Sequence, residues 1–201
     1  MRAAQSSRER EYTRREEIIA ATYRAFVDKG FYNVTLQDIS EYAGFSKGVT
    51  MYYFKSKEDV FQALLEWLVA KIAERMTSSV AERSSAWDKL NALIDSVFLG
   101  ARENREFYLV YLDYLSLGSR HHLFGSTHAN FYEQCRELGR HIVEQGMREG
   151  SFRSVDPNAA AAVVRALVDG LCIQWLFDSR VDTFTIYKER CREAAIAFLK
   201  A

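Results

Sequence analysis

Apolar side chains recur along this chain at intervals of three and four residues. In the first strong segment, Ile18, Ala25 and Phe26 fall on one helical face. No segment alternates apolar and polar residues between turn signals, and Pro157 is the single proline. The pattern therefore predicts an all-α fold.

Cap residues and glycines divide the pattern into about nine helices. Thr13 followed by Glu16 fits a capping box, in which the hydroxyl accepts a backbone N–H and the carboxylate reaches back. Asp156 before Pro157 opens a later helix, because Pro suits the first helical position. The polar residues 1–12 are expected to form a mobile arm. We expect helices over residues 13–29, 36–42, 46–53, 56–77, 85–104, 106–117, 125–149, 157–178 and 184–200.

Composition allows a sizeable core. The 201 residues are 48% hydrophobic and 27% charged, so disorder is not expected. The formal net charge is zero, which gives no overall support for nucleic-acid binding. Residues 46–57 nevertheless carry three lysines and no acid. A small basic domain on a neutral body fits these numbers.

Residues 35–57 have the pattern of a helix-turn-helix. Gly44 supplies the turn between two short helices, and Ile39 and Phe54 are among the apolar anchors that would hold their angle. The second helix would then turn five short or hydrogen-bonding residues outward: Ser46, Lys47, Gly48, Met51 and Tyr52. Spacing alone also permits a hairpin packed internally, in a helical small-molecule-binding or scaffold protein without DNA binding.

The segment AGFSKG (43–48) followed by YYFKSKEDVF (52–61), with matching residues from Thr13 onward, resembles the TetR (tetracycline-repressor-like) family of bacterial transcriptional regulators. The resemblance covers residues 13–67. It implies a three-helix DNA-binding domain over residues 13–56 and a helical ligand-binding and dimerisation domain over 57–201. The implied function is that of a ligand-responsive regulator, expected to be a repressor released from a palindromic double-stranded operator by an unknown small molecule.

The same resemblance assigns DNA contacts residue by residue. They fall on Thr35, Ser46, Lys47, Gly48, Tyr52, Tyr53 and Lys57. Three positions depart from the family pattern: Ser40 stands where Ala is common, Thr50 where an apolar residue is usual, and Met51 where Tyr is frequent. Met51 cannot donate a hydrogen bond to a base, but its side chain can contact a thymine methyl group.

Aromatic residues are frequent in the predicted helix over residues 106–117. A helix around Tyr111 is apolar over a wide arc, which places it centrally. Aromatic side chains with hydroxyls can line a ligand pocket, although a plain aromatic core fits equally. The candidate pocket residues are Trp67, Phe98, Phe107, Tyr111, Tyr114, Phe131 and Trp175.

The helix that follows Pro157 carries a wide apolar stripe. Its members are Ala160, Val163, Val164, Leu167 and Leu171. In a monomer this stripe would be core, whereas the resemblance implies a homodimer interface. Two DNA-binding domains about 34 Å apart would meet successive major grooves of the operator.

Other site classes have little support. The three cysteines lack a CxxC pair, which is typical of incidental thiols in a reducing compartment. His121 and His128 are seven residues apart, with no carboxylate or Cys at ligand spacing, so we expect no metal and no cofactor. Motifs of common enzyme classes are absent, and no enzyme activity is expected. Without an apolar start or an uninterrupted apolar run of about 18 residues, a cytoplasmic protein without a membrane span is expected.

Overall fold

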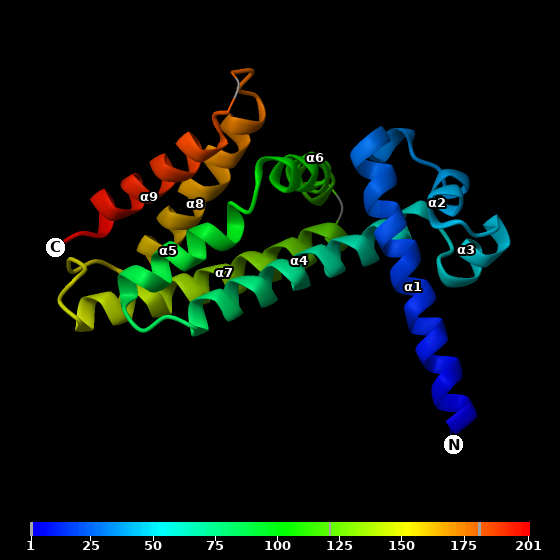
Figure 1. Cartoon of the computed structure of the whole chain (residues 1–201), viewed down its shortest axis with the longest axis horizontal. Helices are drawn as coiled ribbons and strands as arrows, with labels where there is room; N and C mark the ends of the chain where they lie inside the picture. Colours follow the sequence, from blue (N-terminus) through cyan, green and yellow to red (C-terminus); the bar gives the residue numbers. More distant parts are fainter. Residues whose placement is uncertain (1, 121, 181) are drawn as a thin grey trace. The chain divides into compact units, whose positions relative to one another are not determined.

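The computed structural model describes residues 2–120, 122–180 and 182–201, with side chains from Arg10 onward except Leu123. His121 lies outside the described residues. Over this part of the chain the fold is all-α, as predicted, with an isolated bridge between Phe152 and Lys200 as the only β pairing (Figure 1). Its helices are α1 (Arg2–Lys29), η1 (Phe31–Asn33), α2 (Leu36–Ala43), α3 (Lys47–Tyr53), α4 (Lys57–Ala81), α5 (Ala86–Val97), α6 (Ala101–Gly118), α7 (His122–Arg148), α8 (Pro157–Leu176) and α9 (Phe184–Leu199).

The first helix is longer than the sequence pattern suggested. It begins at Arg2 rather than Thr13, so the predicted capping box does not start it. Residues 2–12 contain no Gly or Pro and are rich in Ala, Arg, Glu and Gln, which favour helix. The helix therefore continues through the segment predicted as an arm.

The break between α5 and α6 also differs from the prediction. α5 ends at Val97 and α6 begins at Ala101, whereas a single helix was expected to run to Asn104. The buried Asn104 side chain accepts from the Leu99 N–H (3.1 Å) and donates to the Val97 carbonyl (3.0 Å). These bonds satisfy backbone groups that the end of α5 leaves open, so a turn replaces the helix.

The chain divides into two compact units. We call head the residues up to Leu68 together with Leu109–Thr127, and body Val69–Tyr108 together with the chain from His128 onward. The predicted functional domains, 13–56 and 57–201, stay a prediction. Helices α4, α6 and α7 each contribute residues to both units.

An aromatic cluster forms the core of the head. Phe61 of α4 packs against Phe26 at 4.7 Å and Phe31 at 4.4 Å between ring centroids. Tyr114 of α6 stacks on Phe61 at 3.8 Å and donates its hydroxyl hydrogen to the Phe61 carbonyl at 2.6 Å. Because Tyr114 is 2% exposed, the second half of α6 is part of the head core.

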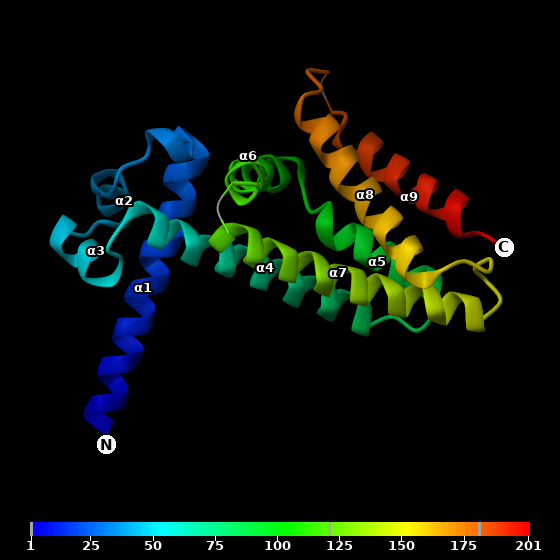
Figure 2. The same cartoon turned by 180° about the vertical axis from the view of Figure 1, so that it is seen from behind.

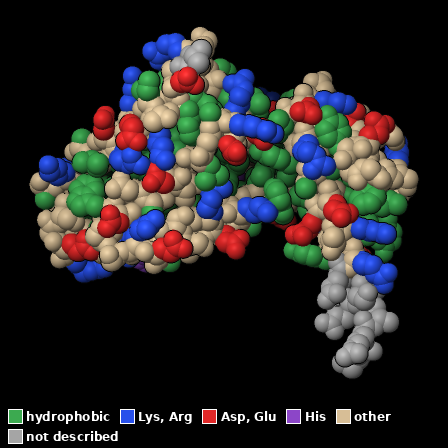
Figure 3. Space-filling model, viewed as in Figure 1, with side chains coloured by type: hydrophobic (Ala, Val, Ile, Leu, Met, Phe, Trp, Pro, Cys, Tyr) green, Lys and Arg blue, Asp and Glu red, His purple; other side chains and the backbone are tan. Residues whose placement is uncertain are grey.

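The body is built around long helices, of which α8 and α9 lie side by side (Figures 1 and 2). By length and composition α8 could cross a membrane, and 33% of its most apolar window is buried. Arg165 and Asp169 form an ion pair on this helix (2.9 Å). On the face shown in Figure 3, basic and acidic side chains are interspersed, in keeping with the zero net charge.

Candidate nucleic-acid interface

A left-handed glycine sets the turn between α2 and α3. Gly44 has φ 70° and ψ 24°, a conformation that residues with a Cβ adopt reluctantly. The next N–H, of Phe45, donates to the Ser40 carbonyl at 3.0 Å and closes the end of α2. The chain then enters α3, where the Ser46 hydroxyl accepts the Val49 N–H at 3.3 Å.

Polar contacts fix the start of α2. Thr35 and Asp38 form a complete capping box. The Lys29 ammonium, hydrogen-bonded to Asp38, and then Thr35 hold the pKa of the Asp38 carboxyl well below its usual range. That hydrogen bond also raises the pKa of Lys29. The C-terminal end of α1 is thereby tied to the first turn of α2.

Two of the three departures from the family pattern, Ser40 and Thr50, contact each other. Thr50 is fully buried, and its hydroxyl oxygen lies 2.9 Å from that of Ser40. Ser40 Oγ also lies 2.7 Å from the Leu36 carbonyl. Since Ser40 has one hydroxyl hydrogen, both contacts are satisfied when Thr50 donates to Ser40 and Ser40 donates to Leu36. This buried chain links α3 to α2.

The opposite face of α3 is open. All five residues predicted to face outward are exposed, with Met51 at 42% and Tyr52 at 66%. Tyr53 is half-buried and packs edge-on against Tyr52 at 5.0 Å. A Cβ added at Gly48 would meet only the Ser46 hydroxyl oxygen, 3.8 Å away. The protein itself therefore does not require glycine there, whereas a partner close to the backbone would.

The lysines near α3 have different surroundings. Lys55 donates to the Met51 carbonyl at 3.1 Å and so caps the end of α3. Lys57, predicted as a DNA contact, donates to the Phe31 carbonyl at 2.8 Å and lies 4.2 Å from the Phe31 ring centroid. Lys47 makes no hydrogen bond or ion pair with any described residue. Of the two lysines predicted to contact DNA, Lys47 is thus the better placed.

Asp113 is a residue of the head that sequence reasoning missed. Its Oδ2 accepts the Phe31 N–H at 3.0 Å, although the two residues are 82 positions apart. Phe31 follows Gly30, whose φ of 71° ends α1. The α1–α2 turn is therefore held by Asp113 of α6 on one side and Lys57 of α4 on the other. No local sequence pattern predicts that Asp113 and Lys57 both bind the backbone of Phe31.

The predicted pocket residues are distributed over both units. Tyr114 belongs to the head core, because Phe61 engages both its ring and its hydroxyl. In the body, Phe98 and Trp175 both pack against Phe184, at 5.8 Å and 4.9 Å. Trp67 and Tyr111 lie in the head, and Phe107 and Phe131 lie in the body. Their role as a pocket wall stays a prediction.

The body contains a polar cluster between α7 and α8. Asp169 accepts from Arg165 at 2.9 Å and from the Tyr132 hydroxyl at 3.1 Å. The Arg165 guanidinium lies 5.2 Å from the Phe131 ring centroid. Beside this cluster is a hollow of about 460 Å³, and a second of about 330 Å³ lies between α4 and α7. The body thus offers both polar groups and space to a small molecule.

The predicted dimer stripe spans two faces of α8. Ala160 and Val164 are 1% and 4% exposed, so they pack inside the single chain rather than on its surface. Val163 is 39% exposed, and Leu167 and Leu171 are half-buried. The apolar arc is wide enough to serve the core with one edge and to leave the other edge for a second subunit.

Comparison with known proteins agrees with this geometry. Residues 18–64 match the family described as "Bacterial regulatory proteins, tetR family". Residues 86–201 match the family described as "BetI-type transcriptional repressor, C-terminal". The HTH-type transcriptional regulator YfiR of Bacillus subtilis (strain 168) is 27% identical over 157 residues, which are 78% of this chain and 76% of that protein.

Solved structures share the fold. A transcriptional regulator from Saccharomonospora viridis in complex with choline has a TM-score of 0.87 at 21% identity, over 93% of this chain and 97% of that one. FadR from Bacillus subtilis in complex with stearoyl-CoA has a TM-score of 0.79 at 19% identity, over 91% and 98%. With family matches to its N-terminal segment and to more than half of its length, the chain belongs to the TetR family of DNA-binding bacterial transcriptional regulators.

Proposed function

We propose that this protein is a homodimeric repressor that binds a palindromic operator and leaves it when a small molecule binds the body. The main observation in support of DNA binding is that α3 has one exposed face and one buried face. Lys47 and Tyr52 are exposed, whereas Thr50 on the opposite face is fully buried. Such a helix can enter the major groove while staying fixed to its domain.

Each exposed position suits a different contact. Lys47 can reach a phosphate or the O6 and N7 of guanine. Gly48 allows the backbone to approach the duplex, and Met51 can contact a thymine methyl group. The Tyr52 hydroxyl and the N–H groups near Thr35, at the start of α2, suit phosphates.

An exposed apolar surface on α8 and α9 supports the homodimer. Val163 is 39% exposed and Ile186 is 48% exposed. Exposed apolar area of this kind favours association, because pairing removes it from water. Light scattering should give twice the 23.2 kDa chain mass, and Val163→Glu with Ile186→Glu should give a monomer. A wild-type monomer at micromolar concentration would remove the basis for reading two half-sites.

The connectivity of α6 supports a ligand response. Residues 101–108 belong to the body, and the continuation of the same helix in the head carries Asp113 and Tyr114. A small molecule that displaces the body half of α6 would act on the α1–α2 turn through one continuous helix. To shift the dimer from about 99% DNA-competent to about 1%, it must prefer the released state by about 5.5 kcal/mol.

The effector class can be approached with two probes. Choline and stearoyl-CoA are bound by two proteins of the same fold, and they differ in charge and size. An effector should raise the melting temperature of the protein and weaken its operator binding. A compound that does only the first is a ligand without regulatory effect. The protein is proposed to act in the cytoplasm, by binding alone and without catalysis.

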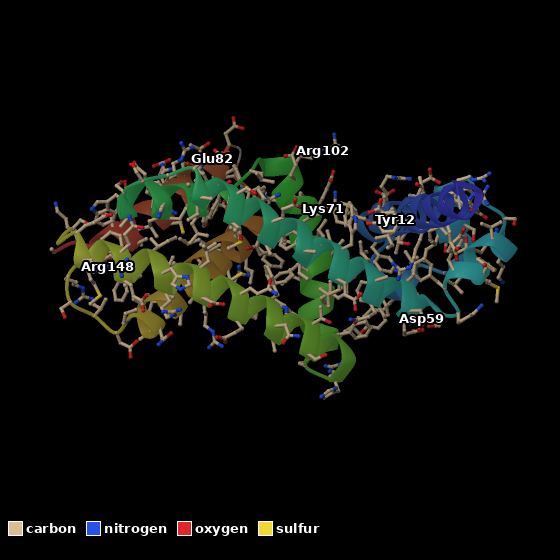
Figure 4. The ribbon with its side chains drawn as sticks, turned by 90° about the horizontal axis from the view of Figure 1, so that it is seen from below. Tyr12, Asp59, Lys71, Glu82, Arg102 and Arg148 are labelled. Carbon is tan, nitrogen blue, oxygen red and sulfur yellow. The ribbon has the colours of Figure 1, made fainter. Side chains whose placement is uncertain are left out.

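A mobility shift with the DNA that flanks the chain's own gene tests the DNA-binding role. We expect salt-sensitive binding to a palindromic fragment. Lys47→Ala and Tyr52→Phe should weaken it by about 1–3 kcal/mol without lowering the melting temperature. Arg102→Ala is the control, since that side chain is 85% exposed on α6 (Figure 4). No binding at low salt would instead favour a helical ligand-binding or scaffold protein.

A further inference from the structure

We propose that the first turns of α1 form a second DNA-binding element, in which Arg10 and Arg14 bind phosphates of the strand beside the groove that α3 enters. The proposal rests on the DNA-binding role of α3 and extends it. These residues precede the region that matches the tetR family, which begins at residue 18. The family match therefore assigns no role to them. We call residues 10–17, which precede that match on α1, the extension.

The extension reaches beyond the packed part of the head. Ile18 is the first buried residue of α1 among those with described side chains, and residues 10–15 are all exposed. Tyr12, labelled in Figure 4, is 65% exposed. In Figures 1 and 2, α1 continues well past the short helices α2 and α3 that lie beside it. A helix with so little packing gains its stability from local contacts alone, and its side chains face solvent rather than the core of the head.

A hollow of about 650 Å³ lies between the extension and α3. Arg10, Glu11 and Arg14 line it from α1. The other lining residues come from α3 and its cap: Ser46, Gly48, Val49, Tyr52 and Tyr53. The hollow thus opens between two arginines and the same α3 positions that are proposed to meet DNA.

Neighbouring arginines on α1 have different environments. The Arg15 guanidinium carbon lies 5.0 Å from the Phe54 ring centroid, so Arg15 binds α1 to the end of α3. Arg14 makes no hydrogen bond or ion pair with any described residue. Arg10 lies one turn before Arg14 on the same helical face, and both line the hollow. A phosphate there could accept charge-assisted hydrogen bonds from both guanidinium groups.

These contacts would position the protein rather than read sequence. Arginine–phosphate bonds carry no base information, so they should strengthen binding to operator and to unrelated DNA alike. Glu11 lines the same hollow and would repel the phosphate strand. Neutralising Glu11 should therefore tighten DNA binding, whereas removing the arginines should weaken it.

The test measures affinity for the operator and for a scrambled duplex of equal length across a series of salt concentrations. Arg10→Ala with Arg14→Ala should make the slope of log K against log salt less negative by about 0.9 per lost contact. At 0.1 M salt this corresponds to about an eightfold loss per contact, on both duplexes. Glu11→Gln should tighten both complexes.

Two single-charge controls accompany these variants. Arg102→Ala removes an exposed arginine from the body unit and should change nothing. Arg15→Ala removes the charge next to Arg14 together with its Phe54 contact. It should lower the melting temperature but leave the salt slope unchanged.

The outcomes separate this inference from the proposed function. If the double variant keeps the wild-type slope and affinity, the phosphate contacts do not exist. Loss confined to the operator would also overturn the proposal, because it would indicate base reading, and so would an equal change of slope in Arg15→Ala. If the wild type binds neither duplex at low salt, the proposed function itself fails, and this inference fails with it.

Discussion

The head and the body are both helical, and side-chain hydrogen bonds fix turns in both, but the head also contains very short helices. In the head, side-chain hydrogen bonds fix short helices at their turns, as in the Ser40–Thr50 chain and the Asp113 contact with the Phe31 N–H. The body packs long helices around apolar side chains and buried thiols, with Cys172 and Cys191 fully buried. Helices of seven or eight residues, such as α3 and α2, are marginal alone, so the angle between them depends on these individual bonds.

The difference has a functional consequence. A DNA-reading helix must be held at one angle, whereas a body that accepts a ligand can repack apolar side chains at modest cost. Single hydrogen bonds should therefore matter for operator binding when they lie in the head. In the body, the loss of one such bond should affect stability alone.

The largest expected effect comes from the aromatic core of the head. Phe61→Ala removes the ring on which Tyr114 and Phe26 pack, and it should lower the free energy of unfolding by about 3–5 kcal/mol. Phe61→Leu keeps most of the volume and should cost less. Urea unfolding measures both. A loss below about 1 kcal/mol for the alanine variant would mean that the head does not depend on this cluster.

The next effect concerns Asp113. Asp113→Ala leaves the Phe31 N–H without its acceptor and should cost about 1–3 kcal/mol of unfolding free energy. Asp113→Asn keeps an oxygen acceptor and should retain most of that stability. Operator affinity should follow the same order, because the bond holds the turn before α2. Equal stability and affinity in the wild type and both variants would show that α6 does not hold this turn.

Sequence reasoning succeeded where the information is local. The cap residues Thr35 and Ser46 placed the starts of α2 and α3, and Gly44 the turn between them, where the structure has them. The helix-turn-helix pattern also predicted which residues of α3 face outward, and all five are exposed, although their contact with DNA stays a prediction.

It failed where a distant residue decides the structure, and where two local patterns compete. Asp113 had no visible partner in the sequence, because Phe31 lies 82 positions away. Asn104 looked like the end of one helix, yet α6 already begins at Ala101 and the Asn104 side chain donates to the Val97 carbonyl. Thr13 looked like a cap, but the residues before it favour helix equally well. The hollow beside α3 could not be predicted without that longer α1.

A smaller effect is expected from the buried hydroxyl pair. Ser40→Ala and Thr50→Val should each cost about 1 kcal/mol in urea unfolding. The double variant should cost less than the sum, since replacing both partners by apolar groups leaves no hydroxyl unsatisfied. Strict additivity would mean that the 2.9 Å contact contributes no coupling. Operator affinity should fall most in Ser40→Ala, because the buried Thr50 hydroxyl then loses its partner. In Thr50→Val, Ser40 still donates to the Leu36 carbonyl.

The smallest expected effect is on the stability of the protein at acid pH. One carboxylate of each unit, Asp38 and Asp178, can be compared. Lys29 in the head and Arg180 in the body hold the pKa of Asp38 and of Asp178 well below the usual range. With a folded pKa below the unfolded value of about 3.9, each contribution is complete above that pH and is lost as pH falls toward the folded pKa.

Asp38→Asn and Asp178→Asn should therefore both flatten the loss of stability below about pH 4, measured by urea unfolding from neutral pH downward. At neutral pH only Asp38→Asn should weaken operator binding, because Asp38 caps α2 whereas Asp178 follows α8. A pH profile of Asp38→Asn identical to that of the wild type would contradict the contact with Lys29. Equal losses of operator affinity in the two variants would show that the cap has no special part in aligning the DNA-reading helices.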